Sequence, residues 1–182
     1  INSVNNGEVL VKNVRAAGII GSSVGNVMIS GCINYGRVHY EGTPEEMNAG
    51  GISGNGIKQY TSGSTTVTTK NSLVIRDCYN YGKIEATCSA GGIVGRTSLA
   101  KPVSGYNYVI ESCGNAGEII CVDGGTSANT KGASGIVGYF LGAANNKISR
   151  CFNVGKISAS TSIDGSVVRA CGIASYMNGT AM

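Results

Sequence analysis

Hydrophobic residues along the chain gather in short β-branched segments, and they do not recur at the three- and four-residue spacing of an amphipathic helix. Val27-Met28-Ile29, Leu73-Val74-Ile75 and Tyr108-Val109-Ile110 are segments of this kind, and residues such as Gly, Asn and Ser lie between them. Val, Ile and Tyr favour strands, whereas Gly and Asn favour turns. The pattern therefore predicts an all-β protein made of many short strands.

Two short motifs alternate along the whole chain. The first is C-x-N-x-G-x-[IV], with Ser in the Cys position of its first copy, and its copies begin at Ser3, Cys32, Cys78, Cys113 and Cys151. The second is A-x-G-I-x-G, with Ser as the last residue of its final copy, and its copies begin at Ala16, Ala49, Ala90, Ala133 and Ala170. Internal repetition of this kind indicates a solenoid, in which each repeat packs on the next. The spacing between copies varies, which a solenoid with loop insertions tolerates and a heptad-based coiled coil does not.

Each repeat contains three short extended segments. The sequence therefore predicts a right-handed parallel β-helix, a β-solenoid of about five three-stranded rungs with loop insertions. We expect residues 1–182 to form a single solenoid domain and to be a piece of a longer protein. Solenoid ends need covering and neither end carries an amphipathic capping helix, so we also expect flanking domains or end-to-end contacts between copies.

Stacking the equivalent residues of each repeat predicts columns that run along the solenoid. Three aliphatic columns form the expected core: Ile29, Ile75, Ile110 and Ile148; Val9, Val38, Ile84, Ile119 and Ile157; and Ile19, Ile52, Ile93, Ile136 and Ile173. A further column holds Asn34, Asn80, Asn115 and Asn153, where we expect an amide ladder. The residues just after the corner glycine mix both charge signs, which predicts ion pairs between Glu8 and Arg37 and between Glu118 and Lys156.

Cysteines supply another column, made of Cys32, Cys78, Cys113 and Cys151. Because a buried Cys behaves as a small hydrophobe, we expect this column to be a ladder of buried thiols, with disulfides as the alternative. Zinc is disfavoured because stacked side chains form a line and not a tetrahedron. Seven cysteines leave at least one thiol free or paired between chains. The other three, Cys88, Cys121 and Cys171, are expected in the core.

Composition narrows the possible functions. The chain has 29 glycines, no Trp and 13% charged residues, which fits a thin aliphatic core with small residues at its corners. The net charge of +4 comes from dispersed basic residues, so we expect no nucleic-acid partner. No apolar stretch approaches the ~20 residues of a membrane-spanning helix, so we expect no membrane insertion within this segment.

The two motifs resemble the GLUG-type repeats of bacterial secreted and surface proteins. The resemblance covers nearly the whole chain through Gly92-Ile93-Val94-Gly95, Gly135-Ile136-Val137-Gly138 and the four Cys-Asn-Gly blocks. Such repeats occur in adhesin-like proteins and in non-catalytic regions of large proteins, including immunoglobulin A peptidases. The resemblance implies a structural or binding module, and the chain has no H-E-x-x-H protease motif.

Candidate catalytic groups are few. Asp77 and Glu111 lie beside the cysteine column on successive repeats, and two carboxylates are what glycoside chemistry needs. Arg76 and Arg150 are nearby, however, so we expect Glu111 to pair with Arg76. His39, the single histidine, is expected at the surface, and the turns at Asp123 and Asp164 each offer calcium only one carboxylate. We therefore predict no catalytic, cofactor-binding or metal-binding residues, no cofactor and no enzymatic activity.

The variable loops are where a solenoid usually carries its function. The insertions occupy residues 41–48, 55–72, 97–107, 122–131 and 158–169, and they contain Tyr60 and Tyr106, which are expected either to cover the core or to stack on sugars. We expect a non-catalytic stalk or adhesin-like module on the bacterial cell surface or outside the cell, binding glycan or a host surface protein through these loops. The alternatives are a carbohydrate-active β-helix enzyme, a lyase or hydrolase, and a non-catalytic segment of a large surface protease.

Overall fold

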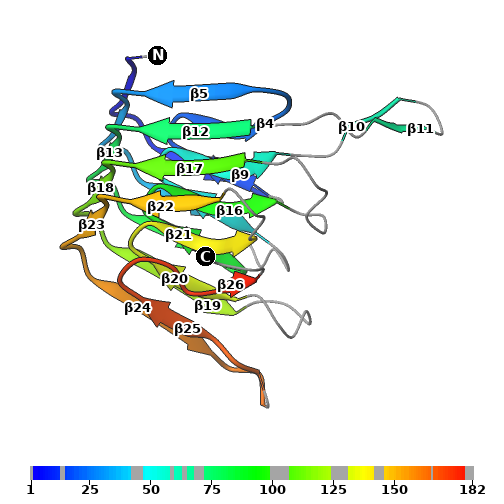
Figure 1. Ribbon diagram of the computed structural model, residues 1–182. Helices are drawn as coiled ribbons and strands as arrows, with labels where there is room; N and C mark the ends of the chain where they lie inside the picture. The colour runs from blue at the N-terminus through cyan, green and yellow to red at the C-terminus, as the bar shows by residue number, and fades with distance from the viewer. Residues whose placement is uncertain are drawn as a thin grey trace.

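The structure is a computed structural model. Successive passes of the chain stack on one another, and their strands pair into parallel β-sheets (Figure 1). It describes residues 2–12, 15–41, 47–57, 60–62, 65–67, 72–98, 107–123, 131–141, 146–164 and 166–178. All regular elements in these ranges are strands, so the described residues contain no helix long and apolar enough to cross a membrane. The expected all-β fold with stacked parallel strands is confirmed.

Five parallel sheets run along the stack, and each pass of the chain, here called a coil, adds a strand to them in turn. The corner sheet contains β1 (Val4–Asn5), β6 (Ile33–Asn34), β13 (Tyr79–Asn80), β18 (Gly114–Asn115) and β23 (Phe152–Asn153). The first flank sheet contains β2 (Val9–Val11), β7 (Val38–Tyr40), β14 (Ile84–Ala86), β19 (Ile119–Asp123) and β24 (Ile157–Thr161).

The next two sheets lie inside the molecule. The first inner sheet contains β3 (Arg15–Ala17), β8 (Asn48–Gly50), β15 (Ser89–Gly91), β20 (Gly132–Ser134) and β25 (Arg169–Cys171). The second inner sheet contains β4 (Ile20–Ser23), β9 (Ser53–Ile57), β16 (Val94–Ser98), β21 (Val137–Leu141) and β26 (Met177–Asn178). The second flank sheet then leads back to the corner through β5 (Val27–Ser30), β12 (Ser72–Arg76), β17 (Asn107–Glu111) and β22 (Lys147–Ser149).

A small hairpin is added to this repeating plan. It pairs β10 (Tyr60–Ser62) with β11 (Thr65–Val67), and it is the one antiparallel pairing among the described strands. It belongs to the insertion that the sequence places between β9 and β12, and Figure 1 shows it projecting from the stack.

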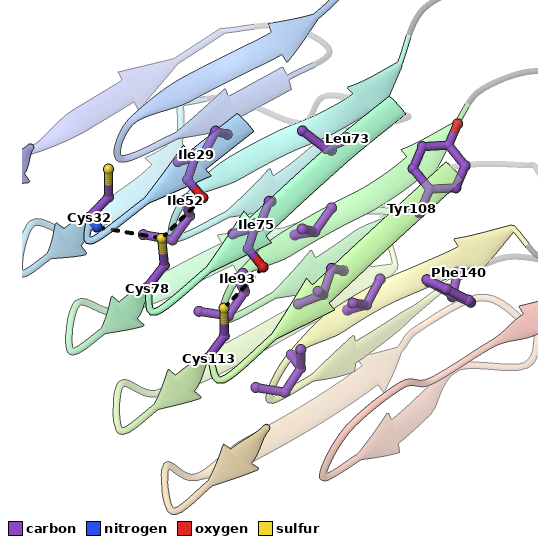
Figure 2. Close-up of a cluster of buried hydrophobic side chains, with 14 residues drawn as sticks. Ile29, Cys32, Ile52, Leu73, Ile75, Cys78, Ile93, Tyr108, Cys113 and Phe140 are labelled. Carbon is purple, nitrogen blue, oxygen red and sulfur yellow. Dashed lines mark hydrogen bonds between the residues drawn. The ribbon is translucent and has the colours of Figure 1, made fainter. Parts of the chain in front are cut away.

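The register of the sheets confirms the predicted columns. Ile75 pairs with Ile29 on one side and Ile110 on the other in the second flank sheet. In the first flank sheet Ile84 lies between Val38 and Ile119 in the same way. The members in the middle coils are fully buried, as Figure 2 shows for Ile29, Ile75 and their neighbours. Equivalent aliphatic side chains of successive coils therefore pack on one another, which is why a repeated sequence specifies this fold.

The core is divided into two layers by the inner sheets. One layer joins the second flank sheet to the second inner sheet and contains Ile75, Ile93 and the cysteine column. The other joins the first flank sheet to the first inner sheet and contains Ile84 and Ala90. The strands of the first inner sheet in the middle coils are buried on both faces. The inner pair of sheets thus fills the space between the two flanks.

Glycine allows the two inner sheets to approach each other. A methyl group added to Gly91 of the first inner sheet would clash with the carbonyl oxygen of Val94 in the second. One added to Gly92, in the turn between these sheets, would clash with the carbonyl of Gly135 and with the side chain of Asn115 in the corner sheet. Such contact is much closer than the ~10 Å between ordinary packed sheets. The A-x-G-I-x-G motif is therefore a sharp bend that carries the chain back on itself.

The prediction of three strands per coil is wrong, because the structure has five parallel sheets. Three segments per repeat would require the A-x-G-I-x-G motif to be one extended segment. Instead its central Gly-Ile forms the bend, and its two ends pair in different sheets. The C-x-N-x-G motif also forms a short sheet of its own at the corner. The right-handed winding and the number of coils stay predictions.

The inner side of the corner carries the expected amide ladder. Asn34 donates its Nδ2 hydrogens to the carbonyl of Gly36 at 2.9 Å and to Oδ1 of Asn80 at 2.7 Å. Asn80 repeats both bonds to Gly82 and Asn115, at 2.8 and 2.7 Å. Each buried amide is thus bonded within its own coil and to the next one, so burial costs little in lost hydrogen bonds. The ladder extends to Asn5, which donates to Asn34 at 2.7 Å.

The residue before each cysteine of the column has a left-handed backbone conformation. Gly31, Asp77, Ser112 and Arg150 all have φ between 52° and 63°. This conformation turns the chain from the second flank sheet into the corner sheet. Gly and Asp adopt it readily, whereas it is less common for Arg.

Candidate functional site

The outer side of the corner sheet carries several of the exposed apolar side chains among the described residues. The residue after each ladder asparagine points outward and forms the outer column, which holds Asn6, Tyr35, Tyr81, Ala116 and Val154. Within it, Tyr35 is 52% exposed, Tyr81 50% and Val154 75%. Exposed apolar groups gathered on one strip mark an interaction surface more often than the same groups scattered singly.

Backbone hydrogen bonds fix the outer column from coil to coil. The N–H of Tyr81 donates to the carbonyl of Asn34 at 2.8 Å, and the N–H of Ala116 donates to the carbonyl of Asn80 at the same distance. The rings of Tyr35 and Tyr81 are stacked, with their centroids 5.1 Å apart and their planes 12° from parallel. The two rings therefore form a short pillar along the axis of the stack.

A second aromatic pair lies on the outward face of the corner sheet itself. Tyr79, Gly114 and Phe152 occupy equivalent positions on neighbouring strands. The rings of Tyr79 and Phe152 are 6.3 Å apart, and Phe152 covers the place where a side chain at position 114 would lie. Phe152 is thus packed against its neighbours while half of it remains exposed.

Ion pairs line the first flank sheet beside the outer column. Glu118 lies 3.7 Å from the Nζ of Lys83 and 3.2 Å from that of Lys156, one coil to either side. The predicted pairs Glu118–Lys156 and Glu8–Arg37 are both present, the latter at 3.7 Å. These groups place hydrogen-bond donors and acceptors next to the aromatic pillar.

Glu111 is bound by basic groups on the second flank sheet. Its carboxylate lies 2.9 Å from Arg150, 3.3 Å from Arg76 and 3.7 Å from Lys147, and Ser149 donates its hydroxyl to it at 3.2 Å. Loss of solvent alone raises the pKa of Glu111, but Arg150, Ser149, Arg76 and Lys147 together hold it below its ordinary value. The expected pairing of Glu111 with Arg76 is confirmed.

The second carboxylate of the pair considered for catalysis lies differently. Asp77 is exposed at the left-handed turn, and its backbone N–H donates to the carbonyl of Glu111 at 3.2 Å. A general acid for glycoside chemistry needs a raised pKa, the opposite of what the neighbours of Glu111 produce. The arrangement around Glu111 therefore supports an ion-pair role for this residue.

His39 is less exposed than the sequence suggested. Only 16% of its side chain is exposed, and its Nε2 lies 2.7 Å from a carboxylate oxygen of Glu8. The alternation along β7 directs His39 away from the core, and the preceding coil places Leu10 beside it and Glu8 within ion-pair distance. It belongs to the ion-pair surface of the first flank sheet.

The cysteine column is a ladder of thiols, buried as predicted at Cys32, Cys78 and Cys113 but only partly buried at Cys151. None of the seven cysteines forms a disulfide, and Cys32, Cys78 and Cys113 are fully buried, as Figure 2 shows. The thiol of Cys78 donates to the carbonyl of Arg76 at 3.1 Å, and Cys113 repeats this bond to Glu111 at 3.3 Å. Burial raises the pKa of Cys32, which keeps this thiol protonated.

The other cysteines divide by depth. Cys88 and Cys121 are buried as expected, whereas Cys171 is only partly buried. In the part of the chain that the structure describes, no three His, Cys, Asp or Glu side chains form a group suited to hold a metal ion. Asp164, considered for calcium, belongs to no such group there, and the side chain of Asp123 and the turn after it lie outside the described residues.

The insertion at residues 158–169 is described except for residue 165, whereas parts of the other four insertions and the side chains of Tyr60 and Tyr106 lie outside the described residues. The outer column was not singled out from the sequence. The signal was the variable position of C-x-N-x-G, where two successive copies carry Tyr at the same place. Residues in the same column of a solenoid lie side by side, so that coincidence predicts a stacked pair.

The fold defines this chain as a parallel β-solenoid. No protein-family model matches it, and no curated protein matches it either. A crystal structure from Bacteroides ovatus, described as a "putative immunoglobulin A1 protease", is similar over 94% of this chain with a TM-score of 0.51 and 20% identity. The matched region is 45% of that protein, so this chain spans less than half of its length. The likeness concerns the fold.

Proposed function

We propose that this chain is a non-catalytic GLUG-type repeat module, with a right-handed coil, of a secreted or cell-surface bacterial protein, and that it binds glycan or host-surface ligands in the manner of an adhesin. The stacked, half-exposed pair of Tyr35 and Tyr81 carries this proposal. Tyr offers a large rigid contact surface with a polar tip, which suits recognition in water. The pair stands on a backbone that the amide ladder holds from coil to coil.

The surroundings of Glu111 favour binding over catalysis. A carboxylate held by three basic side chains stays ionised and has its hydrogen-bonding capacity occupied. Neither property suits a residue that must deliver a proton to a leaving group. The carbohydrate-active enzyme is therefore the less favoured reading.

A second candidate is a non-catalytic segment of a large surface protease. The likeness to the Bacteroides ovatus protein supports it, because that protein is described as a protease and this chain aligns with less than half of it. In this case the solenoid would present or space a catalytic domain carried elsewhere. The two candidates agree if the solenoid holds the target while the other domain acts on it.

A glycan array with the purified chain tests the binding function, and turnover assays on each glycan that binds test catalysis. We expect binding to some glycans and no conversion of any of them. Conversion would overturn the non-catalytic role. The absence of binding both to the array and to a panel of immobilised host surface proteins, immunoglobulin A included, would leave only a spacer and overturn the binding function.

A further inference from the structure

We propose that the free ring face of Tyr81, with Ala116 and Val154 in the following two coils, is a subsite for a pyranose ring of a neutral polysaccharide. This inference rests on the proposed binding function and names its site and ligand class. It places the ligand on the outer column of the corner and not in the variable loops.

One face of the Tyr81 ring is already used and the other is available. Tyr35 stacks on the first face at 5.1 Å, nearly parallel. The opposite face is directed along the stack toward the next member of the outer column, Ala116. An aromatic ring held by a partner on one side is a rigid platform, so little conformational entropy is lost when a ligand covers the other side.

The next position leaves room for that ligand. Ala116 is exposed and has only a methyl group, so the position after Tyr81 in the outer column carries no bulky side chain. The outer column resumes at Val154, which is 75% exposed. Two strand spacings separate the coil of Tyr81 from that of Val154, or about 10 Å. We call the surface between them the step. The Tyr81 ring bounds it on one side and Val154 on the other, and the methyl group of Ala116 lies between them.

Polar groups border this step on the first flank sheet. Lys83, Glu118 and Lys156 follow Tyr81, Ala116 and Val154 by two residues each. Glu118 bridges both lysines, and each of the three side chains keeps at least a third of its surface exposed. The ion pairs hold these donors and acceptors in place, so they are set to bond hydroxyl groups around a ring that lies on Tyr81.

This combination matches a sugar better than a protein partner. The apolar strip is one side chain wide and charged side chains border it, whereas a stable protein interface needs about 800 Å² of each partner. A pyranose ring has an apolar C–H face and a rim of hydroxyls, which fit the Tyr81 face and the ion pairs respectively. The two lysines and one glutamate leave a net charge of only one, which favours a neutral chain over a polyanion.

Affinity electrophoresis in native gels with galactomannan, xyloglucan, mixed-linkage β-glucan and α-mannan tests the subsite. We expect at least one of these neutral polysaccharides to retard the chain, and titration calorimetry with its hexasaccharide then gives Kd. Tyr81→Ala should weaken binding about tenfold or more, and Tyr81→Phe should leave it within about threefold because the ring face is kept.

Ala116→Tyr is the decisive variant. It extends the tyrosine pillar and covers the free face of Tyr81 while Tyr81 itself is unaltered. Two other coils carry Tyr at this position, so we expect the fold to be kept and binding to be lost. Asn6→Tyr, in the coil before Tyr35, adds a ring at the other end of the pillar, leaves the step open and is the matched control. Thermal unfolding of every variant separates a lost site from a lost fold.

The outcomes separate this subsite from the broader function. If neutral polysaccharides bind and Ala116→Tyr binds them as well as the unaltered chain, the subsite is wrong and the binding function stands. If none of the four retards the chain while acidic glycans or host proteins bind, the ligand class is wrong and the binding function again stands. If nothing binds in either assay, both proposals fall.

Discussion

Asn34 and Tyr35 are neighbours in the chain, but they lie on opposite sides of the corner, Asn34 fully buried and Tyr35 half exposed. On the inner side the same residue recurs from coil to coil, because each amide bonds to the next and any other side chain would break the ladder. On the outer side the equivalent positions hold Asn, Tyr, Ala and Val. The inner side therefore determines the fold, and the outer side is free to differ between coils and to carry recognition.

The largest effect is expected where the inner bend touches the ladder. Gly92→Ala places a methyl group against the carbonyl of Gly135 and the side chain of Asn115. The N–H of Gly135 donates to the carbonyl of Cys171 and the amide of Asn115 donates to Asn153, so both groups are held in place. We expect a loss of more than about 4 kcal/mol in the free energy of unfolding, or no folded protein. Circular dichroism during thermal unfolding measures the effect.

The matched control is Gly21→Ala. No atom lies within 4 Å of a methyl group added at Gly21, so we expect unchanged or slightly higher stability. Equal unfolding temperatures for Gly92→Ala and Gly21→Ala would mean that the inner sheets do not need their close approach.

The next largest effect is expected from the ladder itself. Asn80→Ala removes the partner of Asn34, of Asn115 and of the Gly82 carbonyl at once. Each buried polar group left unpaired costs about 1–3 kcal/mol, so we expect a loss of about 2–5 kcal/mol in urea unfolding. Asn5→Ala, at the more exposed end of the ladder, should cost about 1 kcal/mol. The same loss at both positions would contradict a ladder that is strongest where it is buried.

These inner features also show how far the sequence alone leads. Ile75, Asn80, Cys78 and the pair Glu118–Lys156 were predictable because each follows from aligning one repeat on the next. The bend at Gly92 was not predictable, because an extended segment and a sharp bend use the same small residues. The bend is recognised from the pairing of its two ends in different sheets.

The outer side was missed for a different physical reason. Solvent-facing positions are not constrained by packing, so their residues differ between repeats and form no motif. The sequence therefore predicted the binding surface in the loops with Tyr60 and Tyr106 and not at the corner. Tyr35 and Tyr81 become a site only when the register places them in contact.

A smaller effect is expected from the buried thiol of Cys32 at high pH. Burial raises the pKa of Cys32 above the ordinary 9.0, so the folded protein keeps this proton when the unfolded chain has lost it. The stability that the thiol contributes is complete below pH 9.0 and falls by up to about 1.4 kcal/mol per pH unit as the pH rises toward the folded pKa.

Cys32→Ala should remove that part of the alkaline loss. We expect its free energy of unfolding to fall less than that of the unaltered chain over the first pH unit above 9.0, measured by urea unfolding with a reductant present. Parallel pH profiles of the two proteins would show that Cys32 titrates normally in the folded state.

The smallest effect concerns the outer side, where the fold gains little from any one residue. Tyr35 and Tyr81 stack at 5.1 Å with half of each ring in solvent, so a double-mutant cycle with Tyr35→Ala and Tyr81→Ala should give a coupling of about 0.5–1.5 kcal/mol. The single changes should each cost less than Asn80→Ala, although Tyr81 and Asn80 are adjacent in the chain. A coupling near zero would mean that the pillar is not formed in solution, and Tyr81 would then lack the rigid support that its free face needs. A cost as large as that of Asn80→Ala would place the outer column among the determinants of the fold, and the division of labour between the two sides of the corner would fail.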